Sequence, residues 1–282
     1  ESDLTSPNAS IGQQKYFRLR NEVRFNDWTY FRLDNIKMTD VSVVKKNPCI
    51  KLETNQTILH VNNSELKNID VFRNGQDSYN YAIFSPEAYS NISFANSSLE
   101  GVFHKNNFSY YDGIFNQNHG DSISVRNSSF SWLGRGFWSN SPSEKFLRNC
   151  KFTDIAGTGI DVRSANTSDS IFVYGCEFIR LDGNAMYLEG NDRFTVTVKN
   201  STIKNTHDGI YAHQPPILTI DRCLFSDNQW AVRAYHTNAH ITGSLLILNS
   251  TISNNAYGLQ LGYDDDSYFS SVVIMNSILR ND

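Results

Sequence analysis

The sequence predicts an all-β solenoid, a single domain built as a stack of similar coils, and three observations support this. A large apolar residue recurs every 22 to 33 residues, each time after a short polar step such as Asn-Ser-Ser or Asn-Ser-Thr. A second short segment of alternating polarity follows each of these residues. No window has the 3.6-residue period of a long amphipathic helix. A period in the twenties built from two short segments is typical of stacked coils.

The first repeated segment carries the large apolar residue, which we expect to form one continuous core stack. A small Ser or Cys stands two positions earlier, and strand alternation places it inside as well. Cys150, Cys176 and Cys223 are therefore predicted to be small buried residues. Cys150 and Cys176 lie on adjacent coils, where a disulfide is geometrically attainable. The large apolar residues are Leu66, Leu99, Phe130, Phe152, Phe178, Ile203, Phe225, Ile252 and Leu279.

The second segment alternates with period two, which predicts a half-buried strand. Its inward positions are all apolar: Ile160, Met186, Ile210, Val232 and Leu259. Asn, Asp and Gly cluster between the segments, and these residues tolerate the left-handed backbone of sharp corners. Strands that recur without helices can pair with their copies in the next coil. The sequence therefore predicts a parallel β-helix.

The pattern Asn-Ser-Thr-Ile-Ser-Asn-Asn-Ala-Tyr-Gly-Leu-Gln-Leu at residues 249–261, with its copies, resembles the right-handed parallel β-helix repeat family. This superfamily includes pectate lyases, and the resemblance covers about residues 56–282. It implies a right-handed solenoid, a fold that hosts many functions. The number of repeats predicts about nine or ten coils. Residues 1–55 repeat poorly and are predicted to form an irregular N-terminal cap with the first coils. Residues 56–282 hold the repeats, and the incomplete last repeat suggests that they continue beyond the chain end.

Composition excludes several classes of function. The net charge of −4 with mixed signs argues against a nucleic-acid-binding protein, which needs a basic face. No apolar run is long enough for a membrane span. There is no Cys-x-x-Cys and no His at zinc spacing, so we predict no metal site and no cofactor. Residues 264–266 (Asp-Asp-Asp) are a weak calcium candidate, with a solvated acidic turn as the alternative.

Ten Asn-x-Ser/Thr sequons are consistent with a secreted glycoprotein at an extracellular or cell-surface location. Four of them coincide with the repeat's own Asn position, which favours a ladder of stacked Asn side chains instead. These four are Asn96, Asn127, Asn200 and Asn249, and the others are Asn8, Asn55, Asn62, Asn91, Asn107 and Asn166.

Candidate functional residues lie on the outward positions of the second segment, in two rows whose members are about 4.8 Å apart. Aromatic rings beside planar hydrogen-bonding groups suit an extended sugar chain, which offers apolar ring faces and hydroxyl or carboxylate groups. The alternative is that the aromatics only stabilise the solenoid, or are covered by another segment or subunit. The first row is Phe84, Phe115, Trp138, Asp161, Tyr187, Tyr211, Arg233 and Gln260. The second row is Pro86, Gln117, Asn140, Arg163, Glu189, His213, Tyr235 and Gly262. We assign substrate binding to Trp138, Tyr187, Phe115, Phe84, Asn140 and Gln260.

The charged middle of these rows suits β-elimination on a uronic acid. A cation would neutralise the sugar carboxylate and acidify the adjacent C–H bond, a base would take the proton, and an acid would protonate the leaving oxygen. The candidates for these roles are, in that order, Arg233 or Arg163, His213 or Tyr211, and Tyr235 or Tyr187. Epimerisation shares the first half of this reaction, but the Asp-Pro-His motif of mannuronan epimerases is missing here.

Inverting hydrolysis is the other chemistry that the rows allow. Asp161 and Glu189 stand diagonally on adjacent coils, about 7–8 Å apart by strand geometry, which is within the range that inverting glycosidases use. Arg163 stands beside Glu189, however, and would hold it ionised, so that Glu189 would be a poor general acid. A polysaccharide lyase is therefore preferred over an inverting glycoside hydrolase.

We therefore predict an extracellular polysaccharide-interacting β-helix protein, with lyase chemistry on uronic-acid-containing polysaccharide as the favoured reaction. The alternative is a non-catalytic solenoid: an adhesin, a stalk, or a component of a larger surface or filament assembly. Either could form a homo-oligomer.

Overall fold

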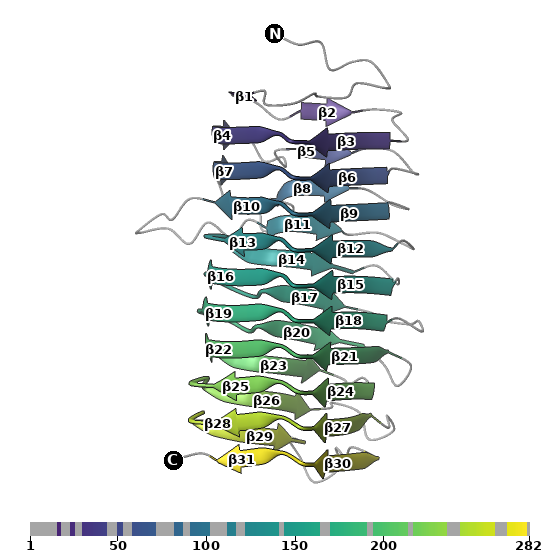
Figure 1. Ribbon diagram of the computed structural model, residues 1–282, viewed down its shortest axis with the longest axis vertical. Coiled ribbons are helices and arrows are strands. Elements are labelled where there is room, and N and C mark those ends of the chain that lie inside the picture. Colours follow the sequence, from purple (N-terminus) through teal and green to yellow (C-terminus); the bar gives the residue numbers. More distant parts are fainter. Residues whose placement is uncertain are drawn as a thin grey trace.

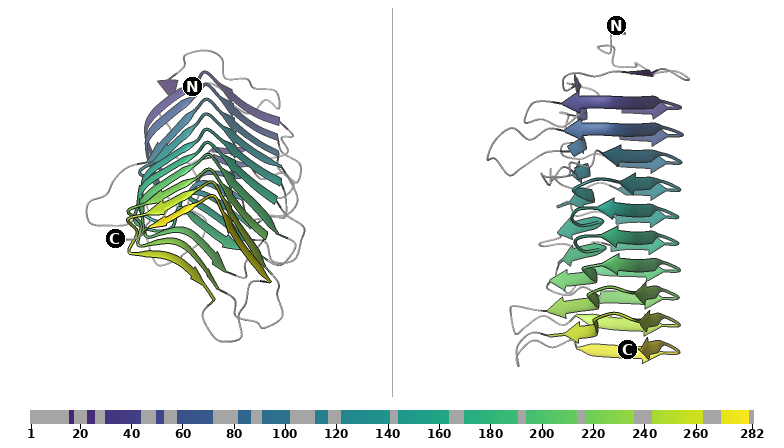
Figure 2. Two further views of the ribbon diagram at one scale, coloured as in Figure 1. Left: turned by 60° about the horizontal axis from the view of Figure 1, so that its bottom comes forward. Right: turned by 90° about the vertical axis from the view of Figure 1, so that its left-hand side faces the viewer.

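The computed structural model is an all-β parallel solenoid of three sheets (Figure 1). It describes residues 16–17, 23–25, 30–43, 50–52, 58–71, 82–86, 91–101, 112–116, 122–140, 144–163, 170–190, 194–213, 217–235, 243–262 and 270–280. In each complete coil the chain passes through the three sheets in turn, and we name them A, B and C in that order. Figure 2 shows sheets A and B meeting at a sharp bend, with sheet C on the far side. The predicted fold class is confirmed.

Each sheet consists of strands that pair in parallel with the equivalent strands of the neighbouring coils. Sheet A contains β3 (Tyr30–Asp34), β6 (Ile58–Asn62), β9 (Asn91–Ala95), β12 (Ile123–Arg126), β15 (Glu144–Arg148), β18 (Ser170–Tyr174), β21 (Thr195–Lys199), β24 (Ile217–Asp221), β27 (Ser244–Leu248) and β30 (Ser271–Met275). Sheet B contains β1 (Tyr16–Phe17), β4 (Lys37–Val43), β7 (Glu65–Val71), β10 (Ser98–Gly101), β13 (Ser129–Ser131), β16 (Lys151–Ile155), β19 (Glu177–Leu181), β22 (Thr202–Thr206), β25 (Leu224–Ser226), β28 (Thr251–Ser253) and β31 (Ile278–Arg280). Sheet C contains β2 (Val23–Phe25), β5 (Ile50–Leu52), β8 (Ala82–Pro86), β11 (Asp112–Asn116), β14 (Arg135–Ser139), β17 (Ile160–Arg163), β20 (Met186–Glu189), β23 (Asp208–His213), β26 (Trp230–Tyr235) and β29 (Tyr257–Leu261).

The number of coils differs from the sequence-based expectation of nine or ten. Sheet B has 11 strands, while sheets A and C have 10 each. The difference arises because β1 to β5, in the poorly repeating N-terminal region, join the same three sheets.

The core is the predicted stack of large apolar residues. The nine residues from Leu66 to Leu279 form eight successive pairs, each between equivalent positions of adjacent coils. The rings of Phe130, Phe152 and Phe178 stack with centroids 4.9 Å apart and nearly parallel planes. All members are fully buried except Leu279 in the last coil, which is 48% exposed. Burying such side chains is the main favourable contribution to a solenoid's stability.

One residue per coil turns the chain from sheet A into sheet B through a left-handed backbone. This residue is usually Asn, which tolerates positive φ. The ten corner residues are Asn35, Asn63, Asn96, Asn127, Asn149, Gly175, Asn200, Arg222, Asn249 and Asn276, with φ between 48° and 64°. The residue that follows the corner is Ile36 after Asn35 and a Ser or Cys in the other coils, and it is buried in every one of these coils except the last.

The three described cysteines at this position are free thiols. The backbone N–H of Cys150 donates to Sγ of Cys176 at 3.4 Å, and no disulfide joins them. In neighbouring coils a Ser hydroxyl accepts the equivalent bond, as Ser97 Oγ does from the Ser64 N–H at 3.0 Å. A Cys thiol and a Ser hydroxyl therefore accept the same backbone hydrogen bond from the preceding coil at this corner.

Several sequence-based predictions fall outside the described residues. They include the Asp264–Asp266 run, the sequons at Asn8, Asn55, Asn107 and Asn166, and the side chains of Phe84, Phe115 and Tyr235. Within the described ranges, no helix is long and apolar enough to cross a membrane. The same ranges contain no cluster of three or more His, Cys, Asp or Glu side chains that could hold a metal ion.

Candidate functional site

The two predicted rows lie along the outer face of sheet C. Phe115 pairs with Trp138, and the first row then continues in register through Asp161, Tyr187, Tyr211, Arg233 and Gln260. The second row continues in register through Arg163, Glu189, His213 and Tyr235. Asn140 is exposed directly after β14. The structure therefore brings most of the predicted site residues onto one face.

The register of β8 against β11 differs from the one that the sequence predicts. Phe84 pairs with Ile114, not with Phe115, so β8 is offset by one residue from the alignment that the sequence suggests. The two strands share an Ile-Phe dipeptide, which makes the wrong register look natural. The predicted pairing of Phe84 with Phe115 is therefore wrong in register.

Tyr187 and Tyr211 form the centre of the face, and their ring planes stack along the solenoid axis. The ring centroids are 5.2 Å apart with an interplanar angle of 27°. The guanidinium of Arg163 lies over Tyr187 at 5.0 Å, and that of Arg233 lies over Tyr211 at 5.2 Å. Both faces of both rings are thus occupied, so the rings offer their edges, not their faces, to a ligand. The sugar-stacking role expected for Tyr187 has no open ring face.

Asp161 occupies an outward position but is only 3% exposed. Its carboxylate accepts a hydrogen bond from Arg135 at 3.0 Å and two from Arg163 at 3.1 and 3.3 Å. Arg163 Nε also lies 4.0 Å from Oε2 of Glu189. Because both carboxylates share this guanidinium and Asp161 is covered, the geometry disfavours the inverting pair of Asp161 and Glu189.

Glu189 instead links a tyrosine and a histidine. The hydroxyl of Tyr187 donates to Oε2 of Glu189 at 3.2 Å, and Nδ1 of His213 lies 3.7 Å from Oε1. Burial, followed by the charge of Glu189, raises the pKa of Tyr187 well above its usual value. Tyr187 therefore keeps its proton at neutral pH.

A third outward row, which two-residue alternation does not predict, lies at the start of β14, β23, β26 and β29. Arg135 belongs to this row, and Asp208, Trp230 and Tyr257 pair in succession further along. Trp230 and Tyr257 stack with centroids 4.0 Å apart. A signal for this row exists in the sequence, because a polar or aromatic residue precedes a small one in each repeat. These dipeptides are Arg135-Gly136, Thr158-Gly159, Asn184-Ala185, Asp208-Gly209, Trp230-Ala231 and Tyr257-Gly258.

Asp208 is the most unusual member of the third row. It is 2% exposed, and its Oδ1 has no hydrogen bond. His207 Nδ1 approaches Oδ1 to 3.2 Å without hydrogen-bond geometry, and Arg233 Nη1 lies 3.7 Å from Oδ2. Burial raises the pKa of Asp208, and its neighbours His207 and Arg233 oppose this rise only in part. Arg233 also lies over Trp230 at 5.7 Å.

Comparison with known proteins gives one family and several solved structures. A family model described as right handed beta helix region matches residues 90–241 and 164–282. The chain is similar to the periplasmic alginate epimerase AlgG, with 10% identity, a TM-score of 0.44, and 94% of this chain and 78% of that chain covered. It is similar to the A-module of the Azotobacter vinelandii mannuronan C-5 epimerase AlgE4, with 9% identity, a TM-score of 0.34, and 95% and 88% covered. It is also similar to the receptor binding domain of the siphovirus 9NA tailspike, with 8% identity, a TM-score of 0.23, and 93% of this chain and 71% of that chain covered. No curated protein matches the sequence significantly.

Proposed function

Because the chain belongs to the family of right-handed β-helix regions, we propose that the outer face of sheet C binds a uronic-acid-containing polysaccharide and cleaves it by β-elimination. One observation carries the proposal. Two guanidinium groups, those of Arg163 and Arg233, bracket a tyrosine pair on one face, with a carboxylate–imidazole pair directly beside it. Cations to receive uronate carboxylates and groups that move protons are the parts that this reaction needs.

The reaction assigns one step to each group. Arg233 neutralises the carboxylate of a uronate residue, which acidifies the neighbouring C5–H bond. His213 takes that proton, the C5–H electrons form the C4=C5 double bond, and the C4–O bond breaks. The leaving oxygen takes a proton from a tyrosine hydroxyl. Glu189, near Nδ1 of His213, orients the imidazole so that Nε2 serves as the base.

Tyr187 is the acid that the geometry favours. Its hydroxyl points to Glu189, next to His213, and its raised pKa keeps it protonated at neutral pH. A protonated phenol can deliver its proton to a departing sugar alkoxide, which is the stronger base. Tyr211 and Tyr235 remain alternatives for proton transfer on the same face.

The proposal puts the protein outside the cell or on its surface, where such polymers occur, and the six sequons outside the Asn ladder are consistent with a secreted glycoprotein. The rows run along the solenoid axis, so the polymer would lie along that axis. Trp138, Asn140 and Gln260 would contact sugars on either side of the reacting residue.

A non-catalytic solenoid, such as an adhesin, a stalk or part of a larger assembly, is the second candidate. The observation that favours it is that the charged and aromatic groups of the face largely satisfy one another. Asp161 is enclosed by Arg135 and Arg163, and the tyrosine faces are capped by arginines. Such a network would also stabilise a purely structural sheet face.

The test is an assay on polymannuronate, polyguluronate and polygalacturonate, following the ultraviolet absorbance of the unsaturated product. We expect His213→Ala and Arg233→Ala to lower kcat by roughly 10²-fold or more, with unchanged circular dichroism. Arg148→Ala is the matched control, because Arg148 lies over Tyr174 in the same way on sheet A and should leave kcat unchanged. A wild-type protein that cleaves none of these polymers would remove the lyase and leave the non-catalytic solenoid.

A further inference from the structure

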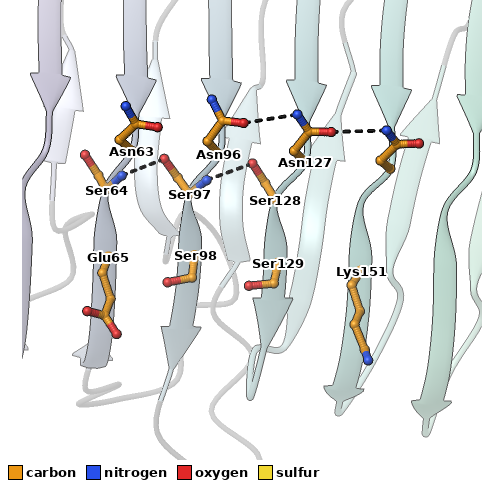
Figure 3. Close-up of a pocket in the computed structure, with 11 residues that line it drawn as sticks. Asn63, Ser64, Glu65, Asn96, Ser97, Ser98, Asn127, Ser128, Ser129 and Lys151 are labelled. Carbon is orange, nitrogen blue, oxygen red and sulfur yellow. Dashed lines mark hydrogen bonds between the residues drawn. The ribbon is translucent and has the colours of Figure 1, made fainter.

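A shallow pocket lies where sheets A and B meet, on the opposite side of the solenoid from the face of sheet C. It has a volume of about 700 Å³ and spans four coils (Figure 3). Among the residues that the structure describes, only polar and charged side chains line it. The lining residues are Asn63, Ser64, Glu65, Asn96, Ser97, Ser98, Asn127, Ser128, Ser129, Asn149 and Lys151.

The hollow results from the sizes of four residues that follow the corner. Glu65, Ser98, Ser129 and Lys151 pair in succession at the start of β7, β10, β13 and β16. Two short serines thus lie between two long charged side chains, as Figure 3 shows. The serines form a floor and the charged residues form the two ends. Three strand spacings separate these ends, about 14 Å.

The side wall is a ladder of asparagine amides with hydrogen-bonding capacity left over. Nδ2 of Asn127 donates to Oδ1 of Asn96 at 3.0 Å, and Nδ2 of Asn149 donates to Oδ1 of Asn127 at 3.1 Å. A primary amide has two N–H donors and two acceptor lone pairs, so each rung keeps one donor and one acceptor. These amides are exposed, which makes the spare groups accessible to a ligand at every coil.

The two floor hydroxyls are also available. Within the described part of the chain, the side chains of Ser98 and Ser129 make no hydrogen bond. The buried serines one position earlier differ, because Ser97 Oγ donates to the Ala95 carbonyl at 2.6 Å and accepts from the Ser64 N–H at 3.0 Å. The pocket therefore presents hydroxyl and amide groups that repeat at about 4.8 Å, the strand spacing.

Both charged ends already have partners of opposite charge. Glu65 lies 2.5 Å from Lys67 and 3.3 Å from Lys37, and Lys151 lies 3.4 Å from Glu177. A charged ligand would have to compete with these pairs, whereas a neutral polyhydroxylated ligand would not. We propose that this pocket is a second binding site, for a neutral oligosaccharide of about three residues lying along the solenoid axis.

The test measures binding of neutral sugars at the pocket itself. Cellotetraose, maltotetraose and mannotetraose are titrated into unglycosylated protein from a bacterial host, and the side-chain amide resonances of Asn96 and Asn127 are followed by NMR. Glycans on these two asparagines, which belong to sequons, would block the pocket, and the bacterial host excludes them. We expect at least one of the three sugars to shift both amides saturably.

A matched pair of double variants isolates the hydroxyls. Ser98→Thr with Ser129→Thr keeps both hydroxyls, while Ser98→Val with Ser129→Val has the same shape without them. We expect the Thr pair to bind within about threefold of wild type and the Val pair to bind roughly tenfold more weakly, as the loss of two hydrogen bonds implies. Arg233→Ala, on the other face, should bind the neutral sugar as wild type does. Equal affinity of the Thr and Val pairs, or no response to any of the three sugars, would overturn the proposal whatever the lyase assay shows.

Discussion

At the scale of single residues, two buried aspartates on the same sheet face are held in opposite ways. Asp161 receives three hydrogen bonds from Arg135 and Arg163. Asp208 has ion-pair neighbours but no hydrogen bond to Oδ1. A buried carboxylate without hydrogen bonds favours its protonated form. Both side chains are buried to a similar extent, so the difference between them lies in the geometry of their partners.

This difference predicts a pH-dependent effect of Asp208→Asn. The folded state raises the pKa of Asp208 above its unfolded value, so it binds the proton more tightly than the unfolded state does. The stability that this provides is present below about pH 4 and is lost as pH rises through the folded-state pKa. Asparagine does not titrate. The melting temperature of Asp208→Asn minus that of wild type should therefore increase between about pH 4 and pH 7.

Asp161→Asn is the contrasting variant for this measurement. It removes a carboxylate that accepts charge-assisted hydrogen bonds, so at pH 7 it should destabilise the fold by roughly 1.5–3 kcal/mol. A melting-temperature difference for Asp208→Asn that is flat or falling over the same pH range would show that His207 and Arg233 fully compensate the burial.

At the scale of elements, the stacked rings of β13, β16 and β19 couple adjacent coils. Phe178 is fully buried, stacks on Phe152 and pairs with Ile203 in the next coil. Phe178→Ala should cost about 3–5 kcal/mol of unfolding free energy, measured by chemical denaturation, because the cavity opens between two coils. Phe178→Leu keeps most of the volume and should cost less. Equal losses for the two variants would mean that cavity volume is not the cause.

How much of the fold and site the sequence predicts depends on where the two-residue period holds. The core stack of large apolar residues and the outward rows from Trp138 to Gln260 follow from simple alternation. The row of Arg135 and Asp208 does not, because Gly136 and Phe137 are buried in succession and break the period. Glycine is needed there, since a Cβ at Gly136 would lie 2.7 Å from the Gly159 carbonyl oxygen and from the Phe152 ring.

Alternation along the sequence cannot predict which side chains of different coils contact one another. The burial of Asp161 depends on Arg135, 26 positions away in the chain, and the orientation of the tyrosine rings depends on arginines in neighbouring coils. The sequence could place these side chains on one face, but not determine whether they would pair with each other or remain open to a ligand. The corner pocket depends in the same way on side-chain sizes in four successive coils.

At the scale of the whole molecule, the solenoid keeps its two proposed sites apart. Each coil contacts mainly its neighbours, and the close-packed core, including Phe130, Phe152 and Phe178, fills the interior of the solenoid. A packed core without a second arrangement offers no bistable element through which the sites could be coupled. The uronate site and the neutral-sugar site should therefore act independently.

Independence predicts additive effects in a variant that combines Arg233→Ala with Ser98→Val and Ser129→Val. Its loss of affinity for a uronate oligomer should equal that of Arg233→Ala, and its loss for the neutral tetrasaccharide should equal that of the serine variants. Sites this far apart without shared partners usually add within about 0.3–0.5 kcal/mol. Isothermal titration of each sugar, with and without saturating amounts of the other, measures both effects. An affinity for one sugar that changes when the other is bound would mean that the faces communicate or that both sugars share one site, and the sheet C variants would then identify that site.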